Sequence, residues 1–326
     1  MKWEDAKKQT FGVEVEMAGI RRRSAATIAA GYFGTGNFRY TGSHSEDGYE
    51  TWSAWDAFGR KWKFSKDVSI VARNDEEKCE LVTPVLTYEE DIELLLGLIR
   101  ELRKAGGISC PQTGCGVHIH IGADAEEPGG HTGRSLRNLI NLMASHEDLL
   151  EKAVGIDRSR MNHYCKKVEA SFLEELNKQK PDSVRGVQEL MYKSEGEEFP
   201  TGNPNLGYNH YRQSRYHMLN LHSLYRTHTV EFRLFQFDNP TAEKKNGLHA
   251  GMLRAYIQLA LCMSEFAKAS RTIKAAKVQS DNDKFAMRTW MNRMDMIGPE
   301  FATAREIFGR KLTGDAAFRY GRNGEL

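Results

Sequence analysis

The chain has 326 residues, of which 40% are hydrophobic and 28% charged, so it can bury one large core or two smaller ones. Its formal net charge of only +2 gives no reason to expect nucleic acid or a membrane surface as a partner. No apolar run approaches the roughly 20 residues that span a bilayer, and residues 1–10 are too polar for a signal peptide. The five cysteines are scattered, which argues against a disulfide framework and favours a reducing cytoplasm.

Residues 10–17 alternate between apolar and polar side chains, which predicts a strand with one buried face. Residues 24–30 predict a short helix that ends at Gly31. The following stretch to residue 65 is rich in glycine and aromatic residues and is interpreted as an insertion, with a hairpin around Trp62 and Phe64.

Residues 79–83 predict a second strand, ended by Pro84. Thr87 and Glu90 have the spacing of a capping box and predict the start of a helix. The apolar residues of that helix recur at helical spacing: Ile92, Leu95, Leu96, Ile99 and Leu102.

Residues 115–121 alternate again, with His118 and His120 on one side and Cys115 on the apolar side, where we expect a core thiol. Residues 137–154 predict a helix. We expect three other histidines to lie on the surface or to cap helices: His131, His146 and His163.

Residues 177–213 are polar and contain prolines, and are interpreted as a loop-rich excursion. Strands are predicted at 216–222 and 229–237, and their short link makes the pair antiparallel. An apolar helix at 248–269 and a polar helix with a glycine-rich tail follow. This order predicts an α+β fold with an antiparallel or mixed sheet rather than a doubly wound parallel one.

The polar faces of the predicted strands carry acids and histidines rather than the Lys, Thr and Gln common on solvated strands. These residues are Glu14 and Glu16, His118 and His120, Asn220 and His222, Glu231 and Arg233, with Glu80 in addition. Carboxylates gathered on one face repel one another unless a cation lies among them. The pattern therefore predicts a metal site.

Several carboxylates and one or two histidines form an oxygen-dominated ligand set, which suits Mg²⁺ or Mn²⁺ better than structural zinc. Mg²⁺ is often bound together with substrate phosphates, which makes a nucleotide a candidate ligand. The glycines at 31–36 lack the Gly-Lys-Ser/Thr of a phosphate-binding loop. Phosphate would therefore be bound by the metal and by arginines such as Arg233.

Seven short segments form an ordered set of motifs along the chain. They are Phe11-Gly12-Val13-Glu14-Val15-Glu16, Asp67-Val68-Ser69-Ile70, Glu80-Leu81-Val82-Thr83-Pro84, Gly114 to Gly122, Arg158 with Tyr164-Cys165, Arg215-Tyr216 with Asn220-Leu221, and Thr229 to Arg233. In this order they resemble the amidoligase family, within the superfamily of glutamate–cysteine ligase and glutamine synthetase. The resemblance extends from Phe11 to about Ala269, most of the chain. At Asp67 the sequence departs from the family, because Val68 follows where the family usually has glycine.

The resemblance implies a fold like the glutamine synthetase catalytic domain: a curved, mostly antiparallel sheet with helices on its convex face. It implies a single catalytic domain over residues 1–326, with a core at about 10–270, insertions near 31–65 and 174–214, and a helical extension at 271–326. It also implies ATP with Mg²⁺ or Mn²⁺ as cofactors. The expected product is an amide, formed through an acyl phosphate with release of ADP.

The resemblance also implies roles for individual residues. Arg233, Glu231 and Glu14 would be catalytic, with Arg233 stabilising the transferring phosphoryl group. The nucleotide would be contacted by His120, Asn220, Arg233 and Arg215. The metal ligands would be Glu14, Glu16, Glu80, His118 and Glu231.

The substrates are expected to be a small-molecule or peptide carboxylate and an amine or ammonia, with an amino acid, a peptide or a protein side chain as the substrate and no nucleic acid or membrane partner. Two alternatives stay open. One is a metal-dependent hydrolase that uses His118 and His120, and the other is a non-catalytic member of the same fold that binds a nucleotide or peptide. Arg212 and Arg215, with the tyrosines around them, fit an anion site as well as they fit a loop that packs on itself.

Overall fold

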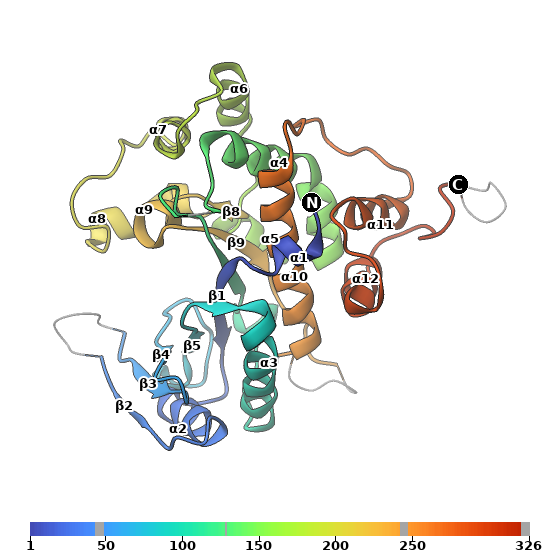
Figure 1. The fold of residues 1–326 in the computed structure, drawn as a ribbon. Coiled ribbons are helices and arrows are strands. Elements are labelled where there is room, and N and C mark those ends of the chain that lie inside the picture. The colour runs from blue at the N-terminus through green and yellow to red at the C-terminus, as the bar shows by residue number, and fades with distance from the viewer. Residues whose placement is uncertain (43–48, 128, 242–246, 321–326) are drawn as a thin grey trace. The chain divides into compact units, whose positions relative to one another are not determined.

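The computed structural model describes residues 1–42, 49–127, 129–241 and 247–320 (Figure 1). The chain forms two compact units. Unit 1 comprises Met1–Gln9, His120–Leu234 and Ala255–Leu326, and unit 2 comprises Thr10–Ile119 and Phe235–Arg254. Helices and antiparallel strand pairs occur in both units, which confirms the predicted α+β class with a mostly antiparallel sheet.

Unit 2 is built on β1, which spans Thr10–Met17 as predicted, with its apolar side chains buried. β1 pairs antiparallel with both β5 and β6, and β4 pairs with β5. The other elements of this unit are α2 (Arg22–Tyr32), β2 (Phe38–Tyr40), β3 (Trp52–Trp55), β4 (Lys61–Ser65), β5 (Cys79–Val82), β6 (Leu86–Thr87), α3 (Tyr88–Lys104) and the first half of β7 (Val117–Gly122).

The predicted insertion forms antiparallel pairs β2–β3 and β3–β4, and the hairpin around Trp62 and Phe64 is confirmed, with both rings fully buried. α2 packs against β3, β4 and α3 (Figure 1). This helix continues through Gly31, where the sequence predicted its end. Phe33, directly after the helix, packs on Trp62 with ring centroids 5.0 Å apart, and this contact extends the helical end.

α3 has the predicted apolar stripe, but its predicted capping box does not form. The Thr87 backbone N–H donates instead to Asp91 Oδ2 at 2.8 Å. Asp91 is buried and also pairs with Arg60 at 2.8 Å, so its carboxylate is fixed where it can accept this bond.

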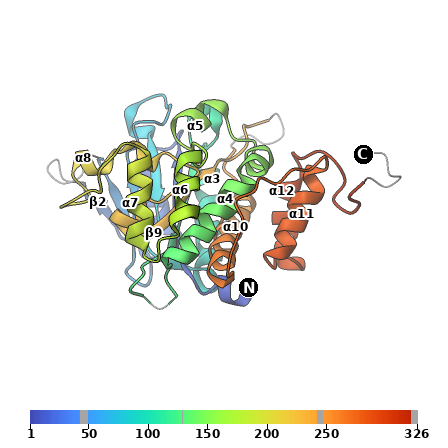
Figure 2. The same ribbon diagram turned by 90° about the horizontal axis from the view of Figure 1, so that it is seen from above.

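Unit 1 is mainly helical, and α4, α6 and α7 pack together (Figure 2). Its complete elements are α1 (Trp3–Ala6), α4 (Gly133–Val154), α5 (Arg158–His163), α6 (Ala170–Gln179), α7 (Val184–Ser194), α8 (Gly207–His210), β8 (Leu219–Asn220), α9 (Ser223–Thr227), α11 (Asp283–Arg293) and α12 (Ala302–Gly309). Three further elements belong to it in part: the second half of β7, β9 (Thr229–Phe235) as far as Leu234, and α10 (Ala250–Ala269) from Ala255 onward.

The loop-rich interpretation of residues 177–213 is wrong in part, because α7 and α8 lie there. α7 is stabilised by packing rather than by composition. Its Val187, Met191 and Tyr192 side chains are buried at helical spacing, although charged residues surround them in the sequence.

β8 and β9 are antiparallel as predicted, and Asn220 lies opposite Glu231. The strand predicted at 216–222 shrinks to two residues. The backbone before it pairs with Lys166, whose N–H donates to the Tyr216 carbonyl at 2.9 Å, and the link to β9 is a short helix.

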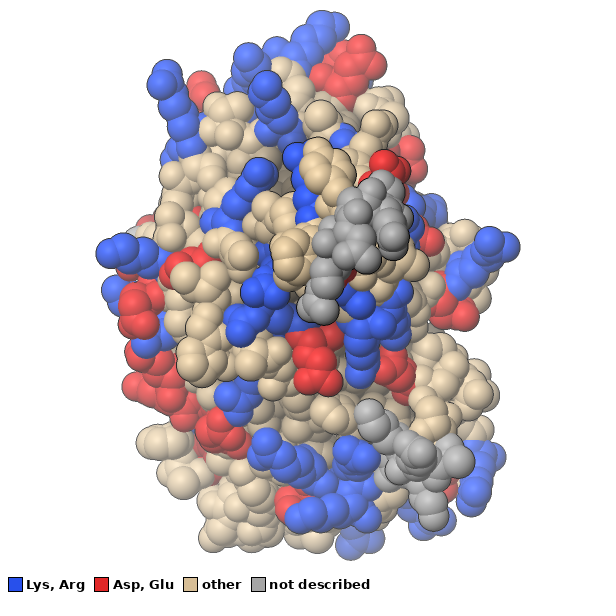
Figure 3. Space-filling model, turned by 90° about the vertical axis from the view of Figure 1, so that its right-hand side faces the viewer, with Lys and Arg blue, Asp and Glu red and all other residues tan. Residues whose placement is uncertain are grey.

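Within the described part of the chain, no helix combines the length and apolar character needed to cross a membrane. Lys and Arg side chains are interspersed with Asp and Glu on the face drawn in Figure 3, as the small net charge suggests. All five cysteines are free and buried, and Cys115 is a core thiol as predicted.

His131 is buried in unit 1, so of the two positions suggested by the sequence, surface or helix cap, the surface one is wrong. Its two ring nitrogens each contact a serine hydroxyl at 3.0 Å, from Ser135 and Ser264. Burial lowers the pKa of His131 to about 3. His146, stacked on Trp290 at 4.1 Å between ring centroids, has its pKa lowered to about 4 by burial.

The lowered pKa values of His131 and His146 predict that the folded protein loses stability in acid. Between about pH 6.5 and 4 the unfolded chain binds protons that the folded chain does not, so the free energy of unfolding falls as pH falls. For His131 alone the loss at pH 5 is about 2 kcal/mol. The melting temperature between pH 7.5 and 5 should therefore drop less steeply in a His131→Gln variant. His163→Gln, at an exposed position, should keep the wild-type slope; equal slopes in both variants would contradict the assignment.

Candidate functional site

In unit 2, three of the predicted metal ligands come from β1 and β5. The antiparallel register places Glu16 opposite Glu80, so their side chains project from the same face of the sheet. Glu14 lies two residues before Glu16 on that face, and the apolar side chains of β1 point the other way. The strand pairing thus brings together carboxylates that are 64 to 66 positions apart in sequence.

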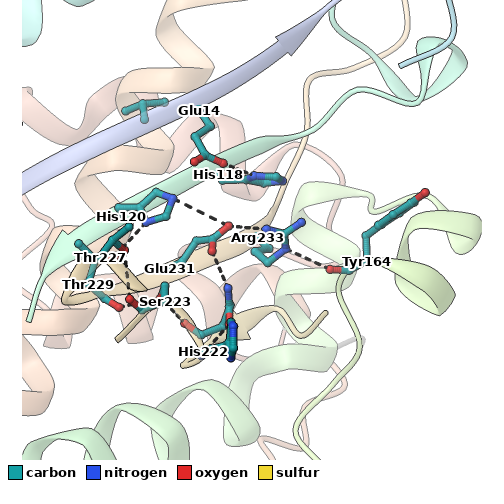
Figure 4. Close-up of polar contacts among 12 residues, drawn as sticks. Glu14, His118, His120, Tyr164, His222, Ser223, Thr227, Thr229, Glu231 and Arg233 are labelled. Atoms are coloured by element: carbon teal, nitrogen blue, oxygen red, sulfur yellow. Dashed lines mark hydrogen bonds and ion pairs between the residues drawn. The ribbon is translucent and has the colours of Figure 1, made fainter. Parts of the chain in front are cut away.

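His118, at the start of β7, contacts two of these carboxylates. Its Nδ1–H donates to Glu14 Oε2 at 2.9 Å, as Figure 4 shows, and its Nε2 lies 3.7 Å from Glu16 Oε1. The Gly116 backbone N–H donates to Glu16 Oε2 at 2.6 Å. Glu14 therefore fixes the orientation of the imidazole and turns Nε2 toward Glu16, the role that carboxylates play behind metal-binding histidines.

Glu16, Glu80 and His118 each offer one ligand atom, and these three atoms all lie within 4.8 Å of one another. Glu16 and His118 are buried and Glu80 is partly so. Two carboxylates and one imidazole fit a divalent cation with a preference for oxygen, such as Mg²⁺ or Mn²⁺, better than a structural zinc ion.

In unit 1, Glu231 is the centre of a buried polar cluster (Figure 4). Arg233 Nη1 donates to Glu231 Oε1 at 2.6 Å, and Asn220 Nδ2 donates to Glu231 Oε2 at 2.6 Å. Glu231 and Arg233 are only 3% and 5% exposed. Because a buried carboxylate and a buried guanidinium need each other, this pair fixes the position of both side chains.

His120 joins the same cluster from the second half of β7. Its Nε2 lies 3.9 Å from Glu231 Oε1, and its Nδ1 contacts Thr229 Oγ1 at 2.9 Å. Thr227 donates its hydroxyl hydrogen to the Ser223 carbonyl, so it accepts from Thr229, which in turn accepts from His120 Nδ1–H. The chain of hydroxyls seen in Figure 4 thereby selects the ring tautomer.

Thr229 and Arg160 support this cluster, and the sequence patterns did not single them out. Thr229 lies two residues before Glu231 on the same strand face, a spacing that would have indicated it. Arg160 Nη2 donates to the Arg233 carbonyl at 2.8 Å, and Arg233 Nε donates to the Tyr164 carbonyl at 3.4 Å. No sequence pattern predicts that the Arg160 side chain binds the backbone carbonyl of Arg233.

Arg215 stands beside Tyr216, its guanidinium carbon 5.5 Å from the ring centroid, and Arg233 lies 5.9 Å from the same centroid. In unit 2, Asp67 closes a local turn and accepts from the Ser69 N–H at 2.7 Å and the Ser69 hydroxyl at 2.6 Å. The structure thus gives Asp67 a local role despite the valine that follows it.

His222, which alternates with Asn220 in the sequence, is fully buried and contacts the Tyr192 hydroxyl at 2.8 Å. Burial, together with the nearby positive charges of Arg215, Arg226 and Arg212, lowers the pKa of His222 to about 4. His222 is therefore neutral at physiological pH and acts as an internal hydrogen-bonding group.

Comparison with known proteins bears on what these clusters do. Residues 7–260 match the family described as "Putative amidoligase enzyme". No curated protein matches the chain. Among solved structures the chain is similar to a bifunctional glutathione synthetase from Pasteurella multocida, at 11% sequence identity and a TM-score of 0.41. That match covers 94% of this chain but 49% of the other, so the chain spans about half the length of that protein. The family match covers most of the chain, and the chain therefore belongs to the amidoligase family.

Proposed function

We propose that the protein is an ATP-dependent ligase that joins a carboxylate to an amine and releases ADP. One observation carries this proposal: a chain of the amidoligase family groups Glu16, Glu80 and His118 with their ligand atoms within 4.8 Å. Such a group fits the divalent cation that accompanies ATP. The carboxylate would first be phosphorylated, and the amine would then displace phosphate from the acyl phosphate.

In this proposal Glu16, Glu80 and His118 bind Mg²⁺ or Mn²⁺. Glu14 orients His118 through Nδ1 and is itself a further candidate ligand. Glu231 is likewise a candidate ligand, because its carboxylate is buried and carboxylate oxygens are ligands that Mg²⁺ prefers. The bound cation would neutralise phosphate charge and orient the phosphate groups.

Arg233 is the proposed stabiliser of the transferring phosphoryl group. Its guanidinium is held by Glu231 and by the Tyr164 carbonyl before any substrate binds, so little reorganisation is needed during the reaction. His120 and Asn220 belong to the same cluster and are proposed to contact the nucleotide. Arg215, beside Tyr216, is a candidate for an anionic ligand.

The substrates in this proposal are a small-molecule or peptide carboxylate and an amine or ammonia. In this proposal, residues 1–326 act as a single catalytic domain. The five free, buried thiols and the use of ATP fit a reducing, cytoplasmic setting.

Hydroxylamine provides a direct test, because it is a small, strong nucleophile that intercepts acyl phosphates. With Mg²⁺, ATP and a panel of amino acids, peptides and other carboxylates, the protein should form a hydroxamate and ADP in equal amounts. Ferric-complex absorbance and chromatography of the nucleotides measure the two products.

The alternative functions give different products in this assay. AMP and pyrophosphate would show attack at the α-phosphorus and would overturn the acyl-phosphate route. Cleavage of a substrate bond without ATP would favour the metal-dependent hydrolase. Binding of Mg-ATP without any product from the panel would favour a non-catalytic member of the fold.

A further inference from the structure

Arg215 is a half-buried arginine with no acidic partner among the described residues. Its guanidinium carbon packs on two aromatic rings, 5.6 Å from the centroid of Tyr211 and 5.5 Å from that of Tyr216. Its Nη1 donates to the His210 carbonyl at 3.1 Å. These contacts fix the plane of the guanidinium but leave its charge unneutralised.

One edge of this guanidinium has no acceptor. Nε is shielded from solvent and has no hydrogen-bond partner in the described part of the chain, and Nη2 makes no hydrogen bond there either. Nε–H and Nη2–H form the fork that binds two oxygens of a carboxylate at once. A buried donor without an acceptor costs about 1–3 kcal/mol, so the arrangement is stabilised when an oxyanion occupies that edge.

The neighbouring arginine serves as a contrast. Arg212 lies three residues away, and its guanidinium donates to the Tyr208 and Glu198 carbonyls and lies 3.8 Å from Glu197. Arg212 therefore has protein acceptors and a carboxylate nearby, whereas Arg215 has a single carbonyl. The cationic edge available to a ligand belongs to Arg215.

Position links this edge to the proposed reaction. Tyr216 is packed by Arg215 and also by Arg233, which binds Glu231. An anion on Arg215 would thus lie near the same tyrosine ring as the arginine proposed to act on the phosphoryl group. Tyr211, which also packs on Arg215, is 56% exposed, so displacement of this side chain would admit a ligand.

The shape of the fork bears on the kind of oxyanion. A carboxylate presents two coplanar oxygens, which match the parallel Nε–H and Nη2–H bonds of one guanidinium edge. A carboxylate is therefore the ligand that we assign to Arg215, and the KM values of the free acid and of Mg-ATP distinguish it from a nucleotide phosphate.

We propose that Arg215 binds a substrate carboxylate that is not the one being activated, and that the substrate is consequently an amino acid or peptide with a free, unreactive carboxylate. That the carboxylate belongs to a ligase substrate rests on the proposed function. That Arg215 binds a carboxylate does not, because binding involves only one guanidinium and one oxyanion.

The test compares matched compounds and matched variants. The compounds are glutamate, aspartate and short peptides that contain them, each as the free acid and as the α-carboxamide or C-terminal amide. The proteins are the wild type, Arg215→Gln, Arg215→Lys and the control Arg212→Gln. ADP release with hydroxylamine gives kcat and KM for each compound and for Mg-ATP, and the melting temperature with millimolar compound measures binding without catalysis.

Arg215→Gln should raise KM for the free acid at least about tenfold, with kcat and the KM of Mg-ATP little changed. Arg215→Lys should recover only part of the loss, because an ammonium does not reproduce the fork. The amides should be poor substrates for all four proteins, and Arg212→Gln should behave like the wild type.

Two results would overturn the inference: an unchanged KM for the free acid in Arg215→Gln, or an increase confined to the KM of Mg-ATP, which would make Arg215 a nucleotide contact. If the wild type releases no ADP with any compound, the proposed ligase activity fails and the melting temperatures decide. A free acid that stabilises the wild type but not Arg215→Gln then supports the carboxylate site, and the absence of any such acid refutes it.

Discussion

Replacing Arg233 by lysine should lower the rate of ADP release about 100-fold or more, although the positive charge is kept. The planar guanidinium binds Glu231 at 2.6 Å through one nitrogen and the Tyr164 carbonyl at 3.4 Å through another, so it is oriented before substrate binds. A lysine ammonium is a flexible point charge and cannot reproduce this geometry. Loss of one preorganised group that stabilises transition-state charge commonly costs 10²–10³ in rate.

The measurement needs a check on folding, because Arg233 and Glu231 form a buried pair and breaking such a pair destabilises proteins. Melting temperature and circular dichroism of Arg233→Lys should stay near wild type, since lysine can still pair with Glu231. Arg134→Lys is the matched control, because that guanidinium donates to the carbonyls of Ser270 and Lys268 in the same unit. A folded Arg233→Lys protein with wild-type turnover would remove Arg233 from the reaction.

The regular elements were predictable where one local pattern dominates. β1 alternates apolar and polar residues over its whole length, and the apolar stripe of α3 has helical spacing, so both were predicted closely. α7 was missed because its apolar residues are separated by charged ones and follow a proline-containing stretch. Its stability comes from packing against α4 and α6, which no local pattern reveals.

The candidate site was also predictable from the sequence only in part. Alternation indicated which side chains share a strand face, and this assigned Glu14, Glu16 and His118 to the polar side. That Glu16 lies opposite Glu80 depends on strand register, which the sequence does not determine by itself. The Arg160 contact to a backbone carbonyl and the open edge of Arg215 depend on the conformation of loops and short helices. Sequence patterns could not choose between an anion site and a self-packing loop for Arg215, because only its contacts distinguish them.

Within β1, two adjacent substitutions should have opposite consequences. Val15 is fully buried on the apolar face and lies opposite Leu81 of β5. Val15→Asp places a carboxylate among apolar side chains, at a cost of several kcal/mol, comparable with the roughly 5–15 kcal/mol that keeps a domain folded. The variant should be unfolded or insoluble at 25 °C, as judged by circular dichroism and the loss of a cooperative melting transition.

Glu14→Gln, one residue away on the polar face, should fold with a melting temperature equal to or above that of the wild type. Removing one of several neighbouring carboxylates relieves repulsion, and the amide can still contact His118. ADP release should nevertheless collapse, because the imidazole loses the carboxylate that orients it and the proposed metal site loses negative charge. Val15→Thr, which keeps the size of valine, separates shape from charge and should cost only about 1–3 kcal/mol. Full activity in Glu14→Gln, or a stable Val15→Asp protein, would show that the two faces of β1 have been assigned the wrong way round.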